Sequence, residues 1–396
     1  MKRYMFMAAA AAMIASAPVS AATAPTPTLP EAGAVRHVYL IMMENHSAQE
    51  IIGNANAPFM TSEAATANQA TSYYGVGHPS LVNYLEVVGG SNFGVTSDYW
   101  PAWAKGGCVD NAAGSTGCAN AVPPLAGTLF DVATSATAQN GGCSLSFTNA
   151  PVINNCAIRD YASTAVTAKT IADQLVEKGL TWKTYQQALP TLGNRIDGVN
   201  YADGSFSNLS QVASTTVIPK LYAVKHNPFV YMANVQAGTT PGVTEAQVAD
   251  FDGTDGLFAD LARNNAPSFS FIVPDQCRDI HKLSGTEAVC NQDGPSIQLA
   301  DAYVKKIVTA IKASKSWASG KGAIIIMFDE NDYANGANVV PFIVDKNYGK
   351  QGVQSTKVYD HFSLLKTLED VYGLPCLNHA CDATSVDMAD LFDRNN

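Results

Sequence analysis

Four short apolar runs limit the fold of this chain more than any other feature of the sequence. Each is rich in β-branched and aromatic residues, a pattern typical of strands that are buried on both faces of a largely parallel sheet. The runs are VRHVYLIMM (35 to 43), PSFSFIV (267 to 273), GAIIIMF (322 to 328) and NVVPFIV (338 to 344).

Two further segments, residues 296 to 317 and residues 361 to 373, have the periodicity of amphipathic helices. Their apolar positions are Leu299, Tyr303, Ile307 and Ile311 in the first segment and Leu364, Leu365, Leu368 and Val371 in the second. Because such helices alternate with the strands, the sequence predicts an α/β fold with a mostly parallel central sheet and helices on both faces.

Polar side chains follow three of the predicted strands at the point where each strand ends. They are Glu44 and Asn45 after the first run, Asp275, Asp279 and His281 after the second, and Asp329 and Glu330 after the third. Ligands bind at the carboxyl ends of the strands in sheets of this kind. We therefore expect these side chains at one edge of the sheet.

Glu44, Asn45, Asp329 and Glu330 are predicted to hold a divalent metal ion. Three carboxylates that converge without a cation repel one another, whereas carboxylate and amide oxygens suit a hard divalent cation. Each acid taken alone is equally consistent with a helix cap or a turn after its strand, and the coincidence of several favours the metal site. The sequence identifies neither the ion nor the number of ions.

A second motif, GVGHPSLVNYLEVVGGS (75 to 91), predicts a helix with Pro79 and Ser80 in its first turn. Backbone N–H groups and the positive end of the helix dipole favour an anion at that place, so a Ser80 hydroxyl there could attack a phosphorus atom. A serine that only caps the helix remains the alternative on this motif alone.

The N-terminal residues predict export. A basic start at Lys2 and Arg3 precedes an apolar run that is shorter than the roughly 20 residues of a membrane-spanning helix. A cleavage site of small residues follows and ends at Ala21. No later run is suited to stable membrane insertion, and the expected destination is periplasmic or extracellular. The predicted organisation is a signal peptide (1 to 21), a flexible tether (22 to 34) and a single domain (35 to 396).

Eight cysteines fall into four couples of near neighbours: 108/118, 143/156, 277/290 and 376/381. An even number in an exported chain predicts four local disulfides, and the lack of any CxxC disfavours a zinc site. Residues from about 97 to 157 contain four of the cysteines and many Gly, Ala and Asn residues. They predict a disulfide-containing insertion, which is either a lid that sets substrate size or a stabilising surface loop.

The formal net charge of -10 argues against a nucleic acid partner, which requires clustered Lys and Arg. An acidic protein still binds a small phosphorylated substrate where a local cation cancels the repulsion.

Taken in order, seven runs of the sequence resemble the blocks of the bacterial phosphoesterase family, within the alkaline phosphatase superfamily. They are HVYLIMMENHSAQEIIGNANAPFM, HPSLVNYLEVVGGS, GLTWKTYQQ, HNPFVYM, PSFSFIVPDQCRDIH, IIIMFDEND and YDHFSLLKTLEDVYGLP, and the resemblance spans about residues 35 to 392. The family contains acid phosphatases and phosphatidylcholine-type phospholipases C.

The resemblance implies a role for each candidate residue. Ser80 would be the nucleophile, His281 and His361 would contact the phosphate or serve the leaving group, and His78 would be catalytic or would position Ser80. The implied metal ligands are Glu44, Asn45, Asp329 and Glu330. His37 and His46 match no role in the pattern and are expected to be structural.

The resemblance further implies a secreted, metal-dependent phosphohydrolase that forms a phosphoserine and is regenerated by water. The compact length and the HPSLVNYL form are similar to the small acid phosphatase branch, which favours phosphate monoesters. Phospholipase C-type cleavage of phosphodiesters is the alternative within the enzyme class. A secreted binding protein without activity is the alternative outside it, and the oligomeric state is not predicted.

Overall fold

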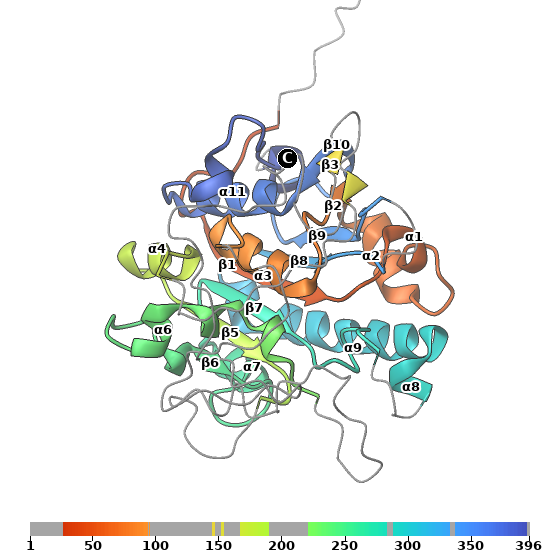
Figure 1. Ribbon diagram of the computed structural model, residues 1–396, viewed down its shortest axis with the longest axis horizontal. Helices are drawn as coiled ribbons and strands as arrows, with labels where there is room; N and C mark the ends of the chain where they lie inside the picture. The colour runs from red at the N-terminus through yellow and green to blue at the C-terminus, as the bar shows by residue number, and fades with distance from the viewer. Residues whose placement is uncertain are drawn as a thin grey trace, which may run out of the picture.

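A single mixed sheet forms the centre of the molecule (Figure 1). The computed structural model describes residues 27–93, 95, 145–146, 152–153, 167–189, 221–282, 288–332 and 337–393. Within these residues, eight strands pair in the order β10-β2-β9-β8-β1-β7-β5-β6, and β3 and β4 form a separate pair. The strands are β1 (Val35–Met43), β2 (Asn68–Tyr74), β3 (Leu145–Ser146), β4 (Val152–Ile153), β5 (Trp182–Gln186), β6 (Val248–Ala249), β7 (Phe269–Val273), β8 (Lys321–Phe328), β9 (Phe342–Lys346) and β10 (Gln354–Asp360).

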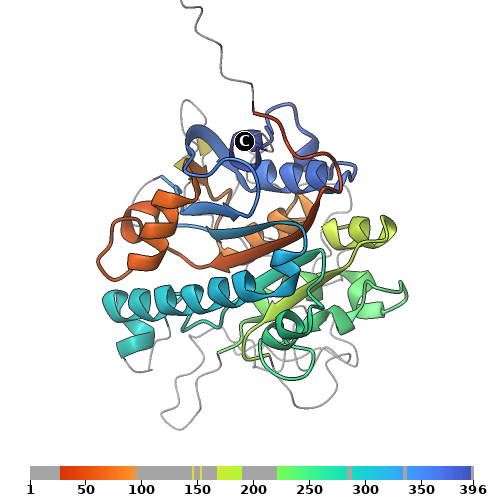
Figure 2. The ribbon, with the colours of Figure 1, turned by 180° about the vertical axis from the view of Figure 1, so that it is seen from behind.

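Helices cover both faces of this sheet, as predicted. The two views from opposite sides show α3 in front of the sheet in one and α9 in front of it in the other (Figures 1 and 2). The described α-helices are α1 (Ala48–Ile51), α2 (Pro58–Thr66), α3 (Ser80–Gly89), α4 (Ile171–Glu177), α6 (Ala233–Ala237), α7 (Leu257–Arg263), α8 (Ala288–Asn291), α9 (Asp293–Ala313), α10 (Lys315–Ala318), α11 (His361–Tyr372) and α12 (Ala389–Phe392).

The sheet is parallel except at β9, which runs antiparallel to both of its neighbours, β2 and β8. Strands β8, β1, β7, β5 and β6 are parallel to one another, and β10 is parallel to β2. Because β8 and β2 are both antiparallel to β9, which lies between them, these two strands point the same way. The carboxyl end of β2 therefore lies at the same edge of the sheet as those of β1, β7 and β8.

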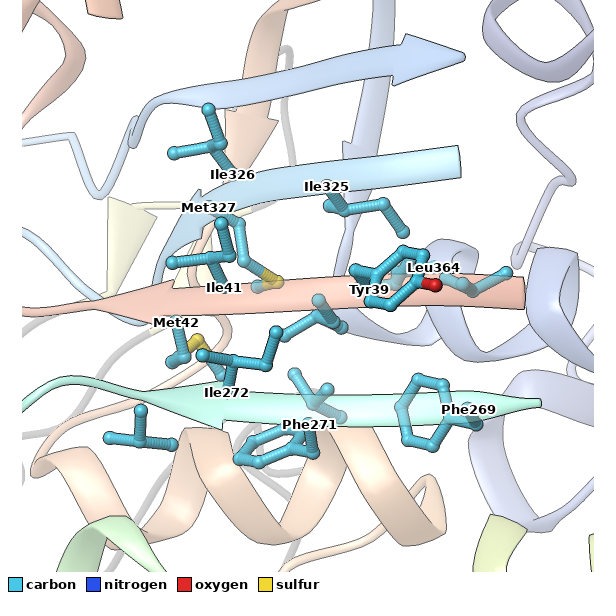
Figure 3. Close-up of a cluster of buried hydrophobic side chains, with 14 of the residues drawn as sticks. Tyr39, Ile41, Met42, Phe269, Phe271, Ile272, Ile325, Ile326, Met327 and Leu364 are labelled. Atoms are coloured by element: carbon cyan, nitrogen blue, oxygen red, sulfur yellow. The ribbon is translucent and has the colours of Figure 1, made fainter. Parts of the chain in front are cut away.

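The three central strands build the core with large apolar side chains (Figure 3). Ile41 of β1, Ile272 of β7 and Ile325 of β8 are fully buried. Burying a side chain of this size stabilises the fold by roughly 1.5–3 kcal/mol. The apolar runs therefore stabilise the strands that carry the polar residues at their ends.

Two predicted elements have different bounds from those expected. The fourth apolar run becomes a strand only from Phe342, because Pro341 has no N–H to donate to a ladder. The predicted helix over 296 to 317 is divided into α9 and α10 at Ser314, whose backbone is extended. Its hydroxyl accepts a hydrogen bond from the Trp317 N–H at 3.1 Å and so caps α10.

Two of the predicted disulfides are present, Cys277–Cys290 and Cys376–Cys381. The other two couples, the predicted signal peptide and nearly all of the predicted insertion lie outside the described residues. Residues 27–34 of the predicted tether pack against the domain: the Gly33 N–H donates to the Val371 carbonyl at 2.8 Å, and the Thr28 N–H donates to Asp393 at 3.1 Å. None of the described helices has both the length and the apolar character needed to cross a bilayer.

Candidate active site

The polar residues that follow β1, β7 and β8 meet at one edge of the sheet, as the strand directions require. The Glu44 N–H donates to the Asp279 carbonyl at 2.9 Å, and the Asp329 N–H donates to the Met43 carbonyl at 3.1 Å. These bonds continue the pairing beyond the strands and fix the carboxylates relative to one another.

Ser80 joins this cluster from α3. It is the first residue of the helix and is 1% exposed. Its Oγ lies 3.1 Å from Glu44 Oε2 and 3.5 Å from Glu330 Oε1. Pro79 is the N-cap residue and not part of the first turn. The structure thus brings the predicted nucleophile to the predicted metal-binding acids.

Gly75 allows the chain to pass close to the site on its way from β2 to α3. A Cβ atom at this position would lie 2.5 Å from the Asp329 carbonyl oxygen and 2.7 Å from Asn338 Nδ2. Both distances are steric clashes. Only glycine fits this approach without a shift of its neighbours.

The oxygen atoms at this edge are suited to a divalent cation. Burial raises the pKa of Asp329 well above its usual range, and the charges of Glu44 and Glu330 raise it further. Within the described part of the chain, Asp329 Oδ2 and Asn45 Oδ1 are buried and have no hydrogen-bond partner. A hard cation would satisfy these oxygens and offset the repulsion, so the predicted set of donors fits such an ion.

Asn45 has a second reason to occupy its position. Its φ of 44° is in the left-handed region, which asparagine tolerates better than most residues. Its N–H donates to Asp329 Oδ1 at 3.2 Å. The turn after β1 therefore ties Asn45 to the end of β8.

His226 is a site residue that the sequence patterns did not single out. Its Nε2 lies 3.0 Å from Glu44 Oε1 and its Nδ1 lies 3.2 Å from Asp279 Oδ2. Burial lowers the pKa of His226 well below its usual value, as do the nearby Lys225 and His281. The ligand atoms of Glu44, His226 and His281 lie within 4.8 Å of one another, so this trio is a second arrangement able to hold a metal ion.

Lys225 is the other residue that sequence reasoning missed. Its ammonium group donates to Ser80 Oγ at 3.3 Å and to His281 Nε2 at 2.9 Å, and the residue is 7% exposed. Lys225 and His226 lie on a 3-10 turn (Val224–His226) that does not directly follow a strand in the sequence. The available signal was the HNPFVYM block, which begins at His226.

His78 contacts Glu330, one of the acids after β8. Its Nδ1 lies 2.7 Å from Glu330 Oε2, which also accepts a hydrogen bond from Asn83 Nδ2 at 3.0 Å. This arrangement orients Glu330 and is consistent with a positioning role for His78.

His361 lies behind the cluster. Its Nε2 donates to the Asp329 carbonyl oxygen at 2.8 Å, and its Nδ1 accepts from the Tyr73 hydroxyl at 2.9 Å. Burial lowers the pKa of His361 to about 4. Both ring nitrogens therefore have protein partners, and contact with phosphate stays a prediction that this geometry does not favour. His37 donates from Nδ1 to the Pro267 carbonyl at 2.8 Å, in keeping with its expected structural role.

Comparison with known proteins identifies the family. The model of the phosphoesterase family matches residues 55–375. The chain is 24% identical over 351 residues to the phosphatidylinositol-3-phosphatase of Mycobacterium tuberculosis, covering 88% of this chain and 81% of that protein. It is 22% identical over 362 residues to a probable acid phosphatase of Kluyveromyces lactis, covering 90% of this chain and 63% of that protein.

Among solved structures, a protein in the alkaline phosphatase superfamily from Vibrio parahaemolyticus superposes with a TM-score of 0.46 at 13% identity. The match covers 90% of this chain and 72% of that one. The family match accounts for most of the chain, and the resemblance inferred from the sequence blocks is confirmed. The chain belongs to the phosphoesterase family, and the predicted enzyme class, a phosphoric ester hydrolase, is confirmed with it.

Proposed function

We propose that the protein is a metal-dependent phosphohydrolase that cleaves phosphate monoesters through a phosphoserine at Ser80. The observation that carries the proposal is the position of Ser80 Oγ, which is buried among Glu44, Glu330 and Lys225. A buried serine hydroxyl beside two carboxylates and an ammonium group has both a proton acceptor and a positive charge within reach.

Glu44, Asn45, Asp329 and Glu330 are the residues that would hold the divalent cation. When bound, the cation neutralises phosphate oxygens and lowers the pKa of a neighbouring hydroxyl. The buried, unsatisfied oxygens of Asn45 and Asp329 support this assignment.

The reaction then proceeds in two displacements. Ser80 Oγ attacks the phosphorus and loses its proton to the adjacent carboxylate group of Glu44, and the bond from phosphorus to the leaving oxygen breaks. Lys225 places its positive charge beside the forming bond. In the second step water attacks the phosphorus, the bond from phosphorus to Ser80 Oγ breaks and inorganic phosphate leaves, and the proton held by Glu44 returns to Ser80 Oγ.

Lys225 and His281 together supply the proton for the leaving oxygen. Burial lowers the pKa of His281 well below its usual value, and the Lys225 charge lowers it further, so the neutral ring accepts a hydrogen bond from the Lys225 ammonium group at 2.9 Å. A proton shared across this bond can pass to the departing oxygen.

Monoesters are favoured over diesters because both relatives described above are named as phosphatases. Phospholipase C-type cleavage of a choline phosphodiester is the alternative. Export is supported by the two disulfides of the described chain, which persist in oxidising compartments.

The test is hydrolysis of 4-nitrophenyl phosphate beside 4-nitrophenylphosphorylcholine, with and without a chelator, by the wild-type protein and by Ser80→Ala. We expect chelator-sensitive release from the monoester that Ser80→Ala loses. A preference for the choline diester would move the assignment to a phosphodiesterase, and no hydrolysis with any divalent metal would favour a binding protein.

A further inference from the structure

A cavity of about 320 Å³ lies beside the residues that follow the end of β1. It is bounded by α1, the loop that follows α1 and the start of α9. Its polar lining consists of His46, Gln49, Glu50, Asn54 and Asp293. His46 connects the cavity to the site, because its Nδ1 donates to the Glu44 carbonyl at 3.1 Å.

The other ring nitrogen of His46, Nε2, lies beside Asp293, a residue of the same lining. His46 is 1% exposed, and its Nε2 has no hydrogen-bond partner among the residues that the structure describes. The Asp293 carboxylate, also in the lining, is 3.8 Å from it, which is too long for a hydrogen bond. A buried ring nitrogen without a partner is unfavourable, so this atom is suited to accept a hydrogen bond from a bound ligand. The unsatisfied Nε2 therefore indicates a role in binding for His46, in place of the structural role expected from the sequence.

A second contact joins the cavity to the proposed proton source. Lys282, directly after His281, forms an ion pair with Asp293 on the cavity wall. The segment that presents His281 to the leaving oxygen is therefore attached to this wall.

We propose that this cavity is the leaving-group subsite, and that it takes an alcohol rich in hydrogen-bond donors, either hydroxyls or an ammonium group. The inference rests on the proposed function. The lining offers acceptors at His46, Glu50 and Asp293 and contains no Lys or Arg, although Lys282 offsets part of the Asp293 charge from outside the lining. Such a lining favours donors and disfavours a second anionic group on the substrate.

The test compares kcat/KM for four monoesters with the metal-loaded full chain. Glycerol 2-phosphate supplies two hydroxyls, phosphoethanolamine an ammonium group, 3-phosphoglycerate a carboxylate beside one hydroxyl, and 4-nitrophenyl phosphate none of these. We expect the wild-type protein to prefer the first two over 3-phosphoglycerate by about tenfold or more. The larger of these two preferences identifies the hydroxyl or the ammonium group as the recognised donor.

Asp293→Lys should reduce this preference by roughly threefold to tenfold, mainly through KM, because it replaces an acceptor with a cation. His46→Leu should lower kcat/KM for the donor-bearing alcohols relative to 4-nitrophenyl phosphate, and His46→Gln, which keeps a polar atom, should lose less. Asp255→Lys, a matched charge reversal at a side chain that is 87% exposed outside this lining, should leave the ratios unchanged.

Unchanged substrate ratios in Asp293→Lys and His46→Leu, with 4-nitrophenyl phosphate still cleaved in a Ser80-dependent way, would overturn the subsite and leave the proposed function intact. Failure of the wild-type protein to cleave any of the four monoesters would overturn both.

Discussion

Lys225 brings an ammonium group within hydrogen-bonding distance of Ser80 Oγ. No other Lys side chain in the described part of the chain is shown at this distance. We predict that Lys225→Met lowers kcat for 4-nitrophenyl phosphate by about 100-fold or more, because it removes a charge aimed at the reacting centre in a buried site. Lys225→Arg should retain part of the activity, since it keeps the charge but changes its geometry.

Steady-state kinetics at saturating metal test this prediction, with circular dichroism as the control for folding. A folded Lys225→Met variant with wild-type kcat would show that the ammonium group is not part of the reaction.

His361 is expected to act through Asp329, because both of its ring nitrogens are occupied by protein groups. We predict that His361→Gln weakens metal affinity by roughly 10-fold to 100-fold, the range found for residues that orient metal ligands, while kcat at saturating metal stays within about tenfold. Metal titrations of activity measure both quantities. A kcat loss of about 100-fold with unchanged metal affinity would instead support the phosphate-contacting role that the resemblance implies.

At the scale of elements, the ends of β1, β7 and β8 account for most of what the sequence predicted about the site. Buried parallel strands have a strong local pattern, and the residues directly after them are fixed by their place in the chain. Lys225 and His226 lie on a 3-10 turn, which has no such pattern, so reasoning from strand ends could not find them.

The direction and the bounds of single strands were less predictable. The hydrophobic pattern of β9 does not encode its antiparallel direction, which is set by the pairing with β2 and β8. β2 has the sequence NQATSYY, which contains too few apolar residues to stand out, although it carries the chain toward Ser80.

The close passage of Gly75 between β2 and α3 supports an element-scale prediction. Gly75→Ala should lower the free energy of unfolding by about 1–3 kcal/mol, because its methyl group would overlap the Asp329 carbonyl and the Asn338 side chain. Activity should fall as well, since Asp329 carries part of the predicted metal site. Urea denaturation and kinetics measure the two effects.

Gly294→Ala is the matched control. The nearest atom to a Cβ there is Asn56 Nδ2 at 3.4 Å, an ordinary contact, and no stability loss is expected. Equal stability of Gly75→Ala and the wild-type protein would refute the steric account of the β2 to α3 connection.

At the scale of the whole molecule, a buried acid outside the site is expected to make stability depend on pH. Burial raises the pKa of Glu369 from 4.5 to about 8, with a further contribution from the charge of Asp370. The pKa of the Glu369 carboxyl is therefore higher in the folded state than in the unfolded state. The contribution of this group to the free energy of unfolding is complete below about pH 4.5 and is lost as the pH rises through about 8.

Glu369→Gln cannot ionise, so its stability relative to the wild-type protein should increase between pH 5 and pH 9 by a few kcal/mol. Denaturation curves across this range test the prediction. A difference in the free energy of unfolding that stays constant across this pH range would show that folding does not shift the pKa of Glu369.

The fold class was predictable because the strands, the helices and the order of the sequence blocks all indicate the same architecture. The phosphoserine mechanism depends on one atom, Ser80 Oγ, and on the groups that surround it.

The most direct measurement of that mechanism is rapid acid quenching during turnover of 4-nitrophenyl phosphate, followed by mass spectrometry of the peptides. We predict one added phosphoryl group on the peptide that contains Ser80, absent without substrate and absent in Ser80→Ala. Turnover with no phosphorylation of that peptide at any quench time, together with undiminished hydrolysis by Ser80→Ala, would contradict it.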